Sequence, residues 1–165
     1  MLHKATIAGL TMDPTTNTPI IILKTDEGEN AIPIWIGLLE ATSIASALQN
    51  VKFDRPMTHD LFKNFSELMN ISVGSVEVCD IKNNTFYARI NFVAESGGFS
   101  MDSRPSDAIA IALRFDAPIF VDDVVIDKSK HFEADGTPTD TSEEGRKWAE
   151  YLENLDPEDF GKYKI

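Results

Sequence analysis

The most constraining feature of the sequence is the apolar run Ala-Ile-Ala-Ile-Ala-Leu at residues 108–113, which directly follows a cluster of charged and polar residues. Arg104-Pro105 suits a helix start, because proline is tolerated in the first turn, where its missing N–H costs nothing. A helix over residues 104–115 has no polar face at 108–113 and is therefore predicted to be buried on all sides. The chain has 165 residues, which suits one domain with a sizeable core.

Strand and helix patterns surround this helix. Alternation or β-branched runs predict strands over residues 2–13, 20–25, 31–36, 71–80, 86–92 and 119–121. Apolar residues at helical spacing predict two further helices over residues 38–50 and 58–70. Asn83-Asn84 predicts a hairpin turn, and Gly97-Gly98 predicts another turn. The expected fold class is α+β, with a mainly antiparallel sheet packed with about three helices, plus a C-terminal helix.

The last quarter of the chain differs in composition from the rest. Residues 127–141 are expected to form a loop, and Ser142 to start a last helix with Trp148, Tyr151 and Leu155 on one stripe. The formal net charge is −12, of which −5 lies up to Val121 and −7 beyond it. We therefore expect a main domain over residues 1–127 and an appended acidic loop and helix over 128–165.

The composition also excludes several classes of protein. No basic patch is present, so tight nonspecific binding to nucleic acid through a positive surface is not expected. Cys79 is the single cysteine, so no internal disulfide can form. No signal peptide and no bilayer-spanning stretch are found, which favours a cytoplasmic protein without a membrane partner. No organic cofactor is expected.

The charged cluster before the apolar helix has two interpretations. As a helix start, Ser103 would be the N-cap, and Asp107 in the first turn would favour the positive helix end and pair with Arg104 three residues away. As a functional site, the same groups would converge on a pocket, together with the free backbone N–H groups of the helix. The helix-start interpretation accounts for every residue of the cluster, but it does not explain why a helix that is buried on all sides begins with two acids and an arginine. Both interpretations stay open on these residues alone.

Three stretches carry a resemblance to a known family. They are residues 31–37 with Glu40-Ala41, residues 55–61, and residues 102–114 followed by Ala117-Pro118-Ile119. In this order they resemble the bifunctional nuclease domain family over about residues 2–125, and residues 155–161 are similar to the tail of its bacterial members. The resemblance implies a compact α+β fold, a dimer, and activity on both DNA and RNA.

The motif positions supply the candidate catalytic residues, which are His59, Asp60, Asp102, Arg104, Ser106 and Asp107. Asp102 and Asp107 could hold a divalent metal such as Mg or Mn, which would activate water and offset the negative charge of the protein. Arg104 could clamp a phosphate through two N–H groups, and His59 could act as general acid or base. The nucleic acid would then be a weakly bound substrate.

Several alternatives remain open. His59-Asp60 also fits a capped, solvated turn, and Asp122-Asp123 fits a strand-ending turn better than a second metal site. The domain could instead bind a small anion, a nucleotide or a protein without catalysis. Trp35, Phe86 and Phe120 lie in or at the ends of strands, and the apolar surface they add predicts a homo-oligomer, most simply a two-fold dimer.

Overall fold

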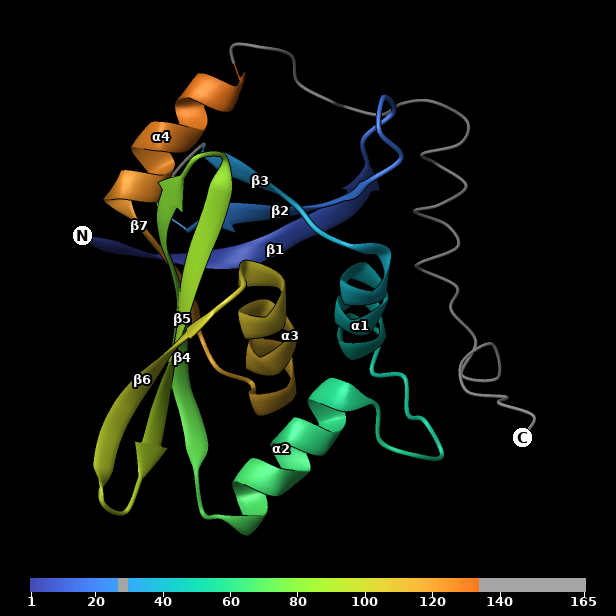
Figure 1. Cartoon of the computed structure of the whole chain (residues 1–165), viewed down its shortest axis with the longest axis vertical. Helices are drawn as coiled ribbons and strands as arrows, with labels where there is room; N and C mark the ends of the chain where they lie inside the picture. Colours follow the sequence, from blue (N-terminus) through green and yellow to red (C-terminus); the bar gives the residue numbers. More distant parts are fainter. Residues whose placement is uncertain (27–29, 134–165) are drawn as a thin grey trace.

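A computed structural model describes residues 1–26 and 30–133 of the chain (Figure 1). The strands are β1 (Leu2–Met12), β2 (Pro19–Thr25), β3 (Ala31–Trp35), β4 (Ser72–Lys82), β5 (Thr85–Ala94), β6 (Gly97–Ser103) and β7 (Ile119–Asp122). The helices are α1 (Leu38–Leu48), α2 (Thr58–Leu68), α3 (Pro105–Phe115) and α4 (Asp123–Glu133). The predicted helices over 38–50, 58–70 and 104–115 are confirmed.

The strands form one seven-stranded sheet in the order β3-β2-β1-β7-β4-β5-β6. Among the described strands, β4 and β7 pair in parallel and all other neighbours are antiparallel. Two antiparallel groups, β1–β3 and β4–β6, are thus joined through the short strand β7. The α+β class with a mainly antiparallel sheet is confirmed.

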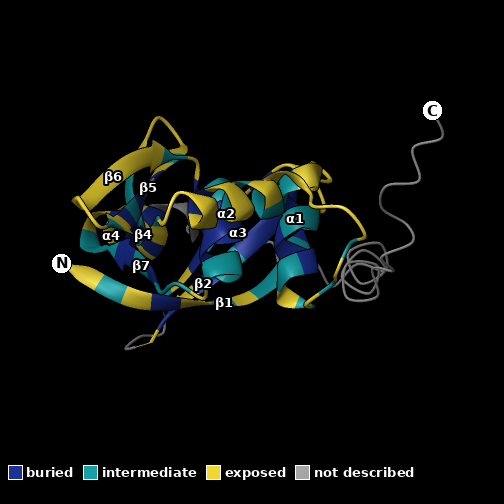
Figure 2. Cartoon of the chain, turned by 90° about the horizontal axis from the view of Figure 1, so that it is seen from below, coloured by how far each residue is buried: buried dark blue, intermediate teal, exposed yellow. Residues whose placement is uncertain are grey.

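Helix α3 lies at the centre of the molecule, as its apolar sequence predicts. It contacts α1, α2, β4 and β5, so that neighbours cover it on several sides. Residues 108–112 are buried, and Leu113 is half-buried against the core. Figure 2 shows α3 mostly in dark blue, with α2 in front of it and α1 beside it. Burial of a side chain such as Ile109 contributes about 1.5–3 kcal/mol, so this helix anchors the fold.

Asparagine residues end both neighbouring helices and form the hairpin. Asn50 follows α1 with φ 53° and Asn70 follows α2 with φ 57°, a left-handed conformation that asparagine tolerates. Asn83 and Asn84 both have positive φ between β4 and β5, which confirms the predicted tight turn. The turn predicted at Gly97-Gly98 is misplaced, because Gly97 already pairs with Ala94 in the ladder of β5 and β6.

The loop expected over residues 127–141 is wrong for residues 127–133, which belong to helix α4. This helix packs on β4 and β7, where Lys128 Nζ donates to Asp80 Oδ1 at 2.6 Å and to the Ile81 carbonyl at 2.8 Å. Long-range contacts of this kind stabilise a helix whose charged sequence gives a weak apolar stripe. The expected last helix with Trp148 lies outside the described residues, and the division at residues 127 and 128 stays a prediction.

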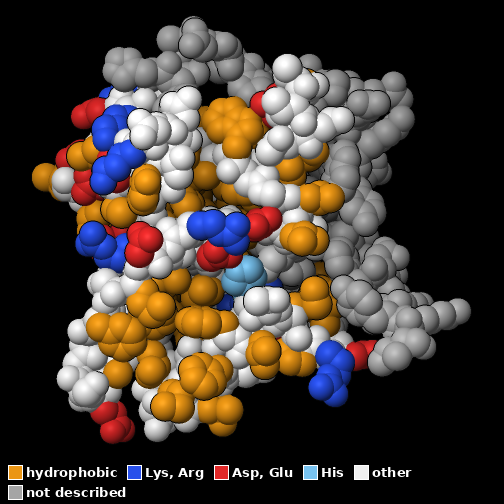
Figure 3. All heavy atoms as spheres, viewed as in Figure 1, with side chains coloured by type: hydrophobic (Ala, Val, Ile, Leu, Met, Phe, Trp, Pro, Cys, Tyr) orange, Lys and Arg blue, Asp and Glu red, His pale blue; other side chains and the backbone are white. Residues whose placement is uncertain are grey.

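One group of large exposed apolar side chains lies around α2 and the neighbouring edge of the sheet. They lie on or beside α2 and on the strands β5 and β6, and comprise Leu61, Phe65, Leu68, Met69, Val93, Phe99 and Met101. Figure 3 shows orange side chains gathered in the lower half of the molecule, where these elements lie. Trp35 is exposed, whereas Phe86 and Phe120 are half-buried.

Within the described part of the chain, none of the helices combines the length and the hydrophobicity that crossing a bilayer requires.

Candidate active site

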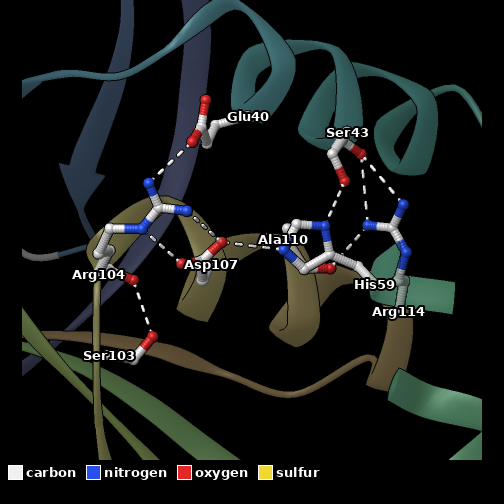
Figure 4. A network of polar contacts seen from close by, with 8 residues as sticks. All are labelled: Glu40, Ser43, His59, Ser103, Arg104, Asp107, Ala110 and Arg114. Carbon is white, nitrogen blue, oxygen red and sulfur yellow. Dashed lines mark hydrogen bonds and ion pairs between the residues drawn. The ribbon is translucent and has the colours of Figure 1, made fainter. Parts of the chain in front are cut away.

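Polar side chains from α1, α2 and α3 meet where the first turn of α3 faces the other two helices (Figure 4). Glu40 and Ser43 come from α1, His59 from α2, and Asp107 from α3, with Arg104 just before the start of α3. Hydrogen bonds link them in the order Glu40–Arg104–Asp107–His59–Ser43. The sequence positions involved span more than 60 residues, so the fold itself assembles this network.

Arg104 joins two carboxylates and remains accessible. Its Nε donates to Asp107 Oδ2 at 2.7 Å and its Nη2 to Asp107 Oδ1 at 3.1 Å, while Nη1 donates to Glu40 Oε1 at 2.8 Å. A guanidinium has five N–H groups, so two of them remain unused by this network. Its side chain is 65% exposed, and those two donors can reach a ligand from solvent. The hydrogen bonds to Asp107 and Glu40 raise the pKa of Arg104, which stays charged.

Glycine before α1 makes room for this arrangement. A Cβ placed on Gly37 would lie 2.1 Å from Glu40 Oε2, closer than real Cβ contacts allow. Any larger residue at Gly37 would therefore push the Glu40 carboxylate away from its present place beside Arg104.

Asp107 is the centre of the network. Burial by itself would raise the pKa of this carboxyl, but hydrogen bonds from Arg104 and His59 outweigh burial and hold the pKa below its usual range. Asp107 is therefore ionised at neutral pH and is a weak base. Its two oxygens accept N–H groups from both neighbours, which fixes the orientation of Arg104 and His59 relative to each other.

His59 lies between a carboxylate and a hydroxyl. Its Nε2 is 3.1 Å from Asp107 Oδ1, and its Nδ1 is 2.7 Å from Ser43 Oγ. An ionised carboxylate can only accept, so neutral His59 carries its proton on Nε2, and Nδ1 accepts from the Ser43 hydroxyl. This sequence of hydroxyl, imidazole and carboxylate can move a proton, because the carboxylate stabilises the imidazolium that forms.

Arg114, at the other end of α3, links α3 to α1 and α2 through hydrogen bonds in the interior. Its Nε donates to Asp60 Oδ1 at 2.5 Å, and its other nitrogens donate to the carbonyls of Ser43 and Ala110. The side chain is only 7% exposed, so Arg114 has no surface left for a ligand. Asp60 also accepts from the Met57 backbone N–H at 3.0 Å, which caps the start of α2. Asp60 is thus a capping and bracing residue in this structure.

The start of α3 differs from the predicted cap. The N-cap residue is Arg104 and not Ser103, whose hydroxyl donates to the Arg104 carbonyl at 2.9 Å. The N-cap of α2 is Met57, the residue before the predicted helix start. Pro105 occupies the first helical position, and the first backbone bond of the helix runs from Ala108 N–H to the Arg104 carbonyl. The N–H groups of Ser106 and Asp107 therefore have no partner within the helix.

A pocket of about 440 Å³ opens beside this helix end. Arg104, Pro105 and Ser106 line it on the α3 side, whereas Asp107 and His59 do not. Arg104 thus belongs both to the network and to the pocket. Ser106 is 5% exposed, and its hydroxyl makes no hydrogen bond to a described residue.

The structure brings together three of the six sequence candidates, namely His59, Arg104 and Asp107. Ser106 faces the neighbouring pocket, and Asp60 pairs with Arg114 instead. Asp102 is exposed on β6, opposite Arg89 in the ladder, and has no side-chain partner among the described residues. Asp60 and Asp102 therefore make no hydrogen bond to His59, Arg104 or Asp107 in this structure.

Sequence reasoning missed Glu40, Ser43 and Arg114. Glu40 and Ser43 are three residues apart, a spacing that places both on one face of α1. Arg114 is the one charged residue between positions 108 and 115 of an otherwise apolar helix. These local patterns mark the three residues. The side chains that they bond to are distant in sequence, so the patterns do not identify the contacts.

The residues present do not form a ready metal site. Both oxygens of Asp107 are engaged by Arg104 and His59, and Asp102 lies outside the network. Within residues 1–26 and 30–133, no three His, Cys, Asp or Glu side chains are grouped so that they could hold a metal ion. The network is an ion-pair and hydrogen-bond network as it stands.

Comparisons with known proteins agree on one family. Residues 21–134 match the bifunctional nuclease domain. An uncharacterised protein of Mycobacterium tuberculosis is 32% identical over 159 residues, which cover 93% of this chain and 95% of that protein. This relative is thus similar along nearly its whole length.

Two plant proteins match over a shorter region. Bifunctional nuclease 1 of Oryza sativa subsp. indica is 31% identical over 106 residues, and its Arabidopsis thaliana namesake is 32% identical over 108 residues. The matches cover 61% and 62% of this chain but only 32% and 33% of the plant proteins. The family match covers Glu40, His59, Arg104 and Asp107. The chain with this network therefore belongs to the bifunctional nuclease domain family.

Proposed function

We propose that this protein hydrolyses phosphodiester bonds in DNA and RNA at the Glu40–Arg104–Asp107–His59–Ser43 network. The observation that carries the proposal is an exposed, doubly anchored Arg104 with two unused N–H groups beside an ionised Asp107 and a histidine. The plant relatives that bear the name bifunctional nuclease support this substrate class.

In this proposal the phosphate binds at Arg104 and the start of α3. The two free guanidinium N–H groups point to a bidentate contact, which is the preferred geometry between arginine and phosphate. The unpaired N–H groups of the first turn and the positive end of the helix dipole favour the same anion. Such a local site suits an acidic protein, because it needs no broad basic surface.

His59 carries the proton. Its Nε2 and Arg104 Nη2 lie at the same distance of 3.1 Å from Asp107 Oδ1, so a phosphate held by Arg104 is close to the imidazole. As an imidazolium beside the Asp107 carboxylate, His59 can donate the Nε2 proton to the leaving oxygen and become a neutral imidazole with its remaining proton on Nδ1. The attacking water loses a proton when its oxygen bonds to phosphorus, and this proton restores the imidazolium. Asp107 is a positioning residue in this scheme, because its lowered pKa makes it a poor base.

The test is a nuclease assay on single- and double-stranded DNA and on RNA. Asp107→Asn and His59→Gln should abolish cleavage while the melting temperature changes little, and Asp54→Asn, at an exposed loop position, is the matched control. If Asp107→Asn unfolds the protein while His59→Gln cleaves at the wild-type rate, the network is structural and the proposal is wrong.

Assistance by Mg or Mn remains a prediction made from the sequence. If a metal assists, cleavage should stop when a chelator is added and should return when either ion is added back. Cleavage that continues in the presence of the chelator would contradict the predicted metal dependence. It would not contradict the roles proposed for Arg104 and His59.

A binding module without catalysis is the alternative. If the protein is such a module, a nucleotide or a small anion should bind at Arg104. No turnover should then be seen, even at high protein concentration and with several metal ions tested. The same assay therefore separates the two functions.

We also propose that the protein acts as a cytoplasmic homodimer. The exposed side chains Leu61, Phe65 and Leu68 on α2 support an interface there, because exposed apolar clusters mark association surfaces. Light scattering at micromolar concentration should give the mass of two chains, and a monomer mass would contradict the dimer.

A further inference from the structure

The pocket beside α3 has a composition that the phosphate site alone does not explain. It lies between the end of β3, the hairpin of β4 and β5, and the start of α3, and its volume of about 440 Å³ is that of a small-ligand site. Arg104 stands at its border with the catalytic network, so a ligand in the pocket can extend to the guanidinium.

Aromatic side chains form part of the pocket wall. Trp35, at the end of β3, and Phe86, at the start of β5, both line it, together with Ile34 and Pro105. The indole Nε1 of Trp35 donates to Asp13 Oδ2 at 2.8 Å, which holds this half-exposed ring in place. A fixed aromatic ring at the edge of an open pocket is a surface on which a planar ligand can stack.

Polar groups also line the same pocket. Ser106 is 95% buried, yet its hydroxyl has no hydrogen-bond partner among the described residues. No fully buried side-chain oxygen or nitrogen in the described part lacks a partner, so the Ser106 oxygen must be reached from the pocket. Asn84 and Thr85 of the hairpin are further polar residues of the pocket lining. The pocket therefore offers both a stacking surface and unused hydrogen-bonding groups.

We propose that this pocket binds one unpaired nucleotide of the substrate, with its base against Trp35 and Phe86 and its phosphate toward Ser106 and Arg104. The identity of the ligand rests on the proposed function. A base within a duplex is stacked and paired, and it cannot enter the pocket without unpairing. The structure thus assigns the protein a preference for single-stranded nucleic acid over the corresponding duplex.

The first test compares adenosine 5′-monophosphate with ribose 5-phosphate, which lacks the base, by calorimetry on the full chain. Adenosine 5′-monophosphate should bind more tightly, and Trp35→Ala should weaken its binding by about 5- to 150-fold, the usual effect of losing one stacked base. Tyr87→Ala removes an exposed aromatic ring of β5 that does not line the pocket, and should leave the affinity for adenosine 5′-monophosphate unchanged. Ser106→Ala should weaken both probes.

Equal binding of the two probes, or an unchanged affinity in Trp35→Ala, would overturn the proposal. The second test is the ratio of cleavage rates for a single-stranded oligonucleotide and its duplex, which Trp35→Ala should lower. An unchanged ratio, with weakened adenosine 5′-monophosphate binding, overturns the assignment to single strands in favour of a free nucleotide.

The outcomes for the pocket and for the proposed function are distinguishable. Base-dependent binding without any cleavage by the wild-type protein contradicts the nuclease and supports the pocket. Cleavage that requires His59, together with base-independent binding, supports the nuclease and contradicts the pocket.

Discussion

Arg104 and Arg114 stand at opposite ends of α3, and both pair with carboxylates, yet their surroundings differ. Arg104 has a side chain that is 65% exposed and keeps two N–H groups unused, whereas Arg114 is 7% exposed and bonds Asp60, Ser43 and Ala110. Accessibility therefore separates a ligand-binding arginine from a bracing one, although both belong to the same sequence motif. Changes at the two positions should accordingly affect different measurements.

Among the changes that compare the two ends of α3, the largest expected effect is that of Arg104→Ala on cleavage. Removing a positioned donor to a charged transition state typically costs about 100- to 1,000-fold in rate. The free energy of unfolding should change by less than about 1 kcal/mol, because ion pairs of exposed side chains contribute little. Arg55→Ala, at an exposed arginine in the loop before α2, is the matched control. An Arg104→Ala protein with full activity would contradict the assignment of Arg104 as the ligand-binding arginine.

Arg114→Ala should instead reduce stability. It leaves Asp60 and the Ser43 carbonyl without their partner, and loss of one member of a buried pair costs about 3–5 kcal/mol. We expect about 3 kcal/mol, because Asp60 is 31% exposed and keeps some solvent contact. Urea unfolding measures this change. A fully stable variant with no activity would place Arg114 in catalysis and contradict the bracing role.

A smaller effect should appear in the pH dependence of stability. The pKa of Asp107 is lower in the folded state than its usual value, so ionised Asp107 stabilises the fold at neutral pH. This contribution is lost as the pH falls from the ordinary aspartate range, about 3.9, through the lower folded value. The difference in unfolding free energy between the wild type and Asp107→Asn should therefore shrink in acid. A constant difference from pH 7 to pH 3 would contradict this prediction.

The smallest effect is expected for Gly37→Ala. The added Cβ should displace the flexible Glu40 carboxylate and remove one of the two anchors of Arg104. Loss of one exposed ion pair corresponds to about 0.2–1 kcal/mol, or about a 1.5- to 5-fold change in KM. Glu40→Gln should reproduce the effect. A Gly37→Ala variant that matches the wild type while Glu40→Gln does not would show that the carboxylate relocates without losing Arg104.

Local sequence patterns predicted most of the fold. The apolar run of α3 and the asparagine hairpin depend on their own residues and their neighbours, and both are confirmed. Helix α4 was missed because its stability depends on contacts with β4, such as that of Lys128 with Asp80. A pattern confined to its own residues contains no information on such partners.

The candidate site was predicted in part for the same reason. Arg104 and Asp107 are three residues apart on one helix, so their pairing follows from helical geometry. Their contacts to Glu40 and His59 depend on how α1 and α2 pack on α3. Asp102, which is near them in sequence, is an exposed residue of β6 with no side-chain partner among the described residues.

The position of β7 has a consequence for how the chain reaches this structure. Although β7 is the last of the described strands in sequence, it lies between β1 and β4 at the middle of the sheet. Its register joins Ala5 to Ile119 across most of the described chain, so the ladder closes only after a large loop has been ordered. During synthesis the edges of β1 and β4 that pair with β7 therefore remain unpaired until residues 119–122 have left the ribosome. Folding should consequently be slow for a domain of this size, and a chain that stops before Ile119 should aggregate.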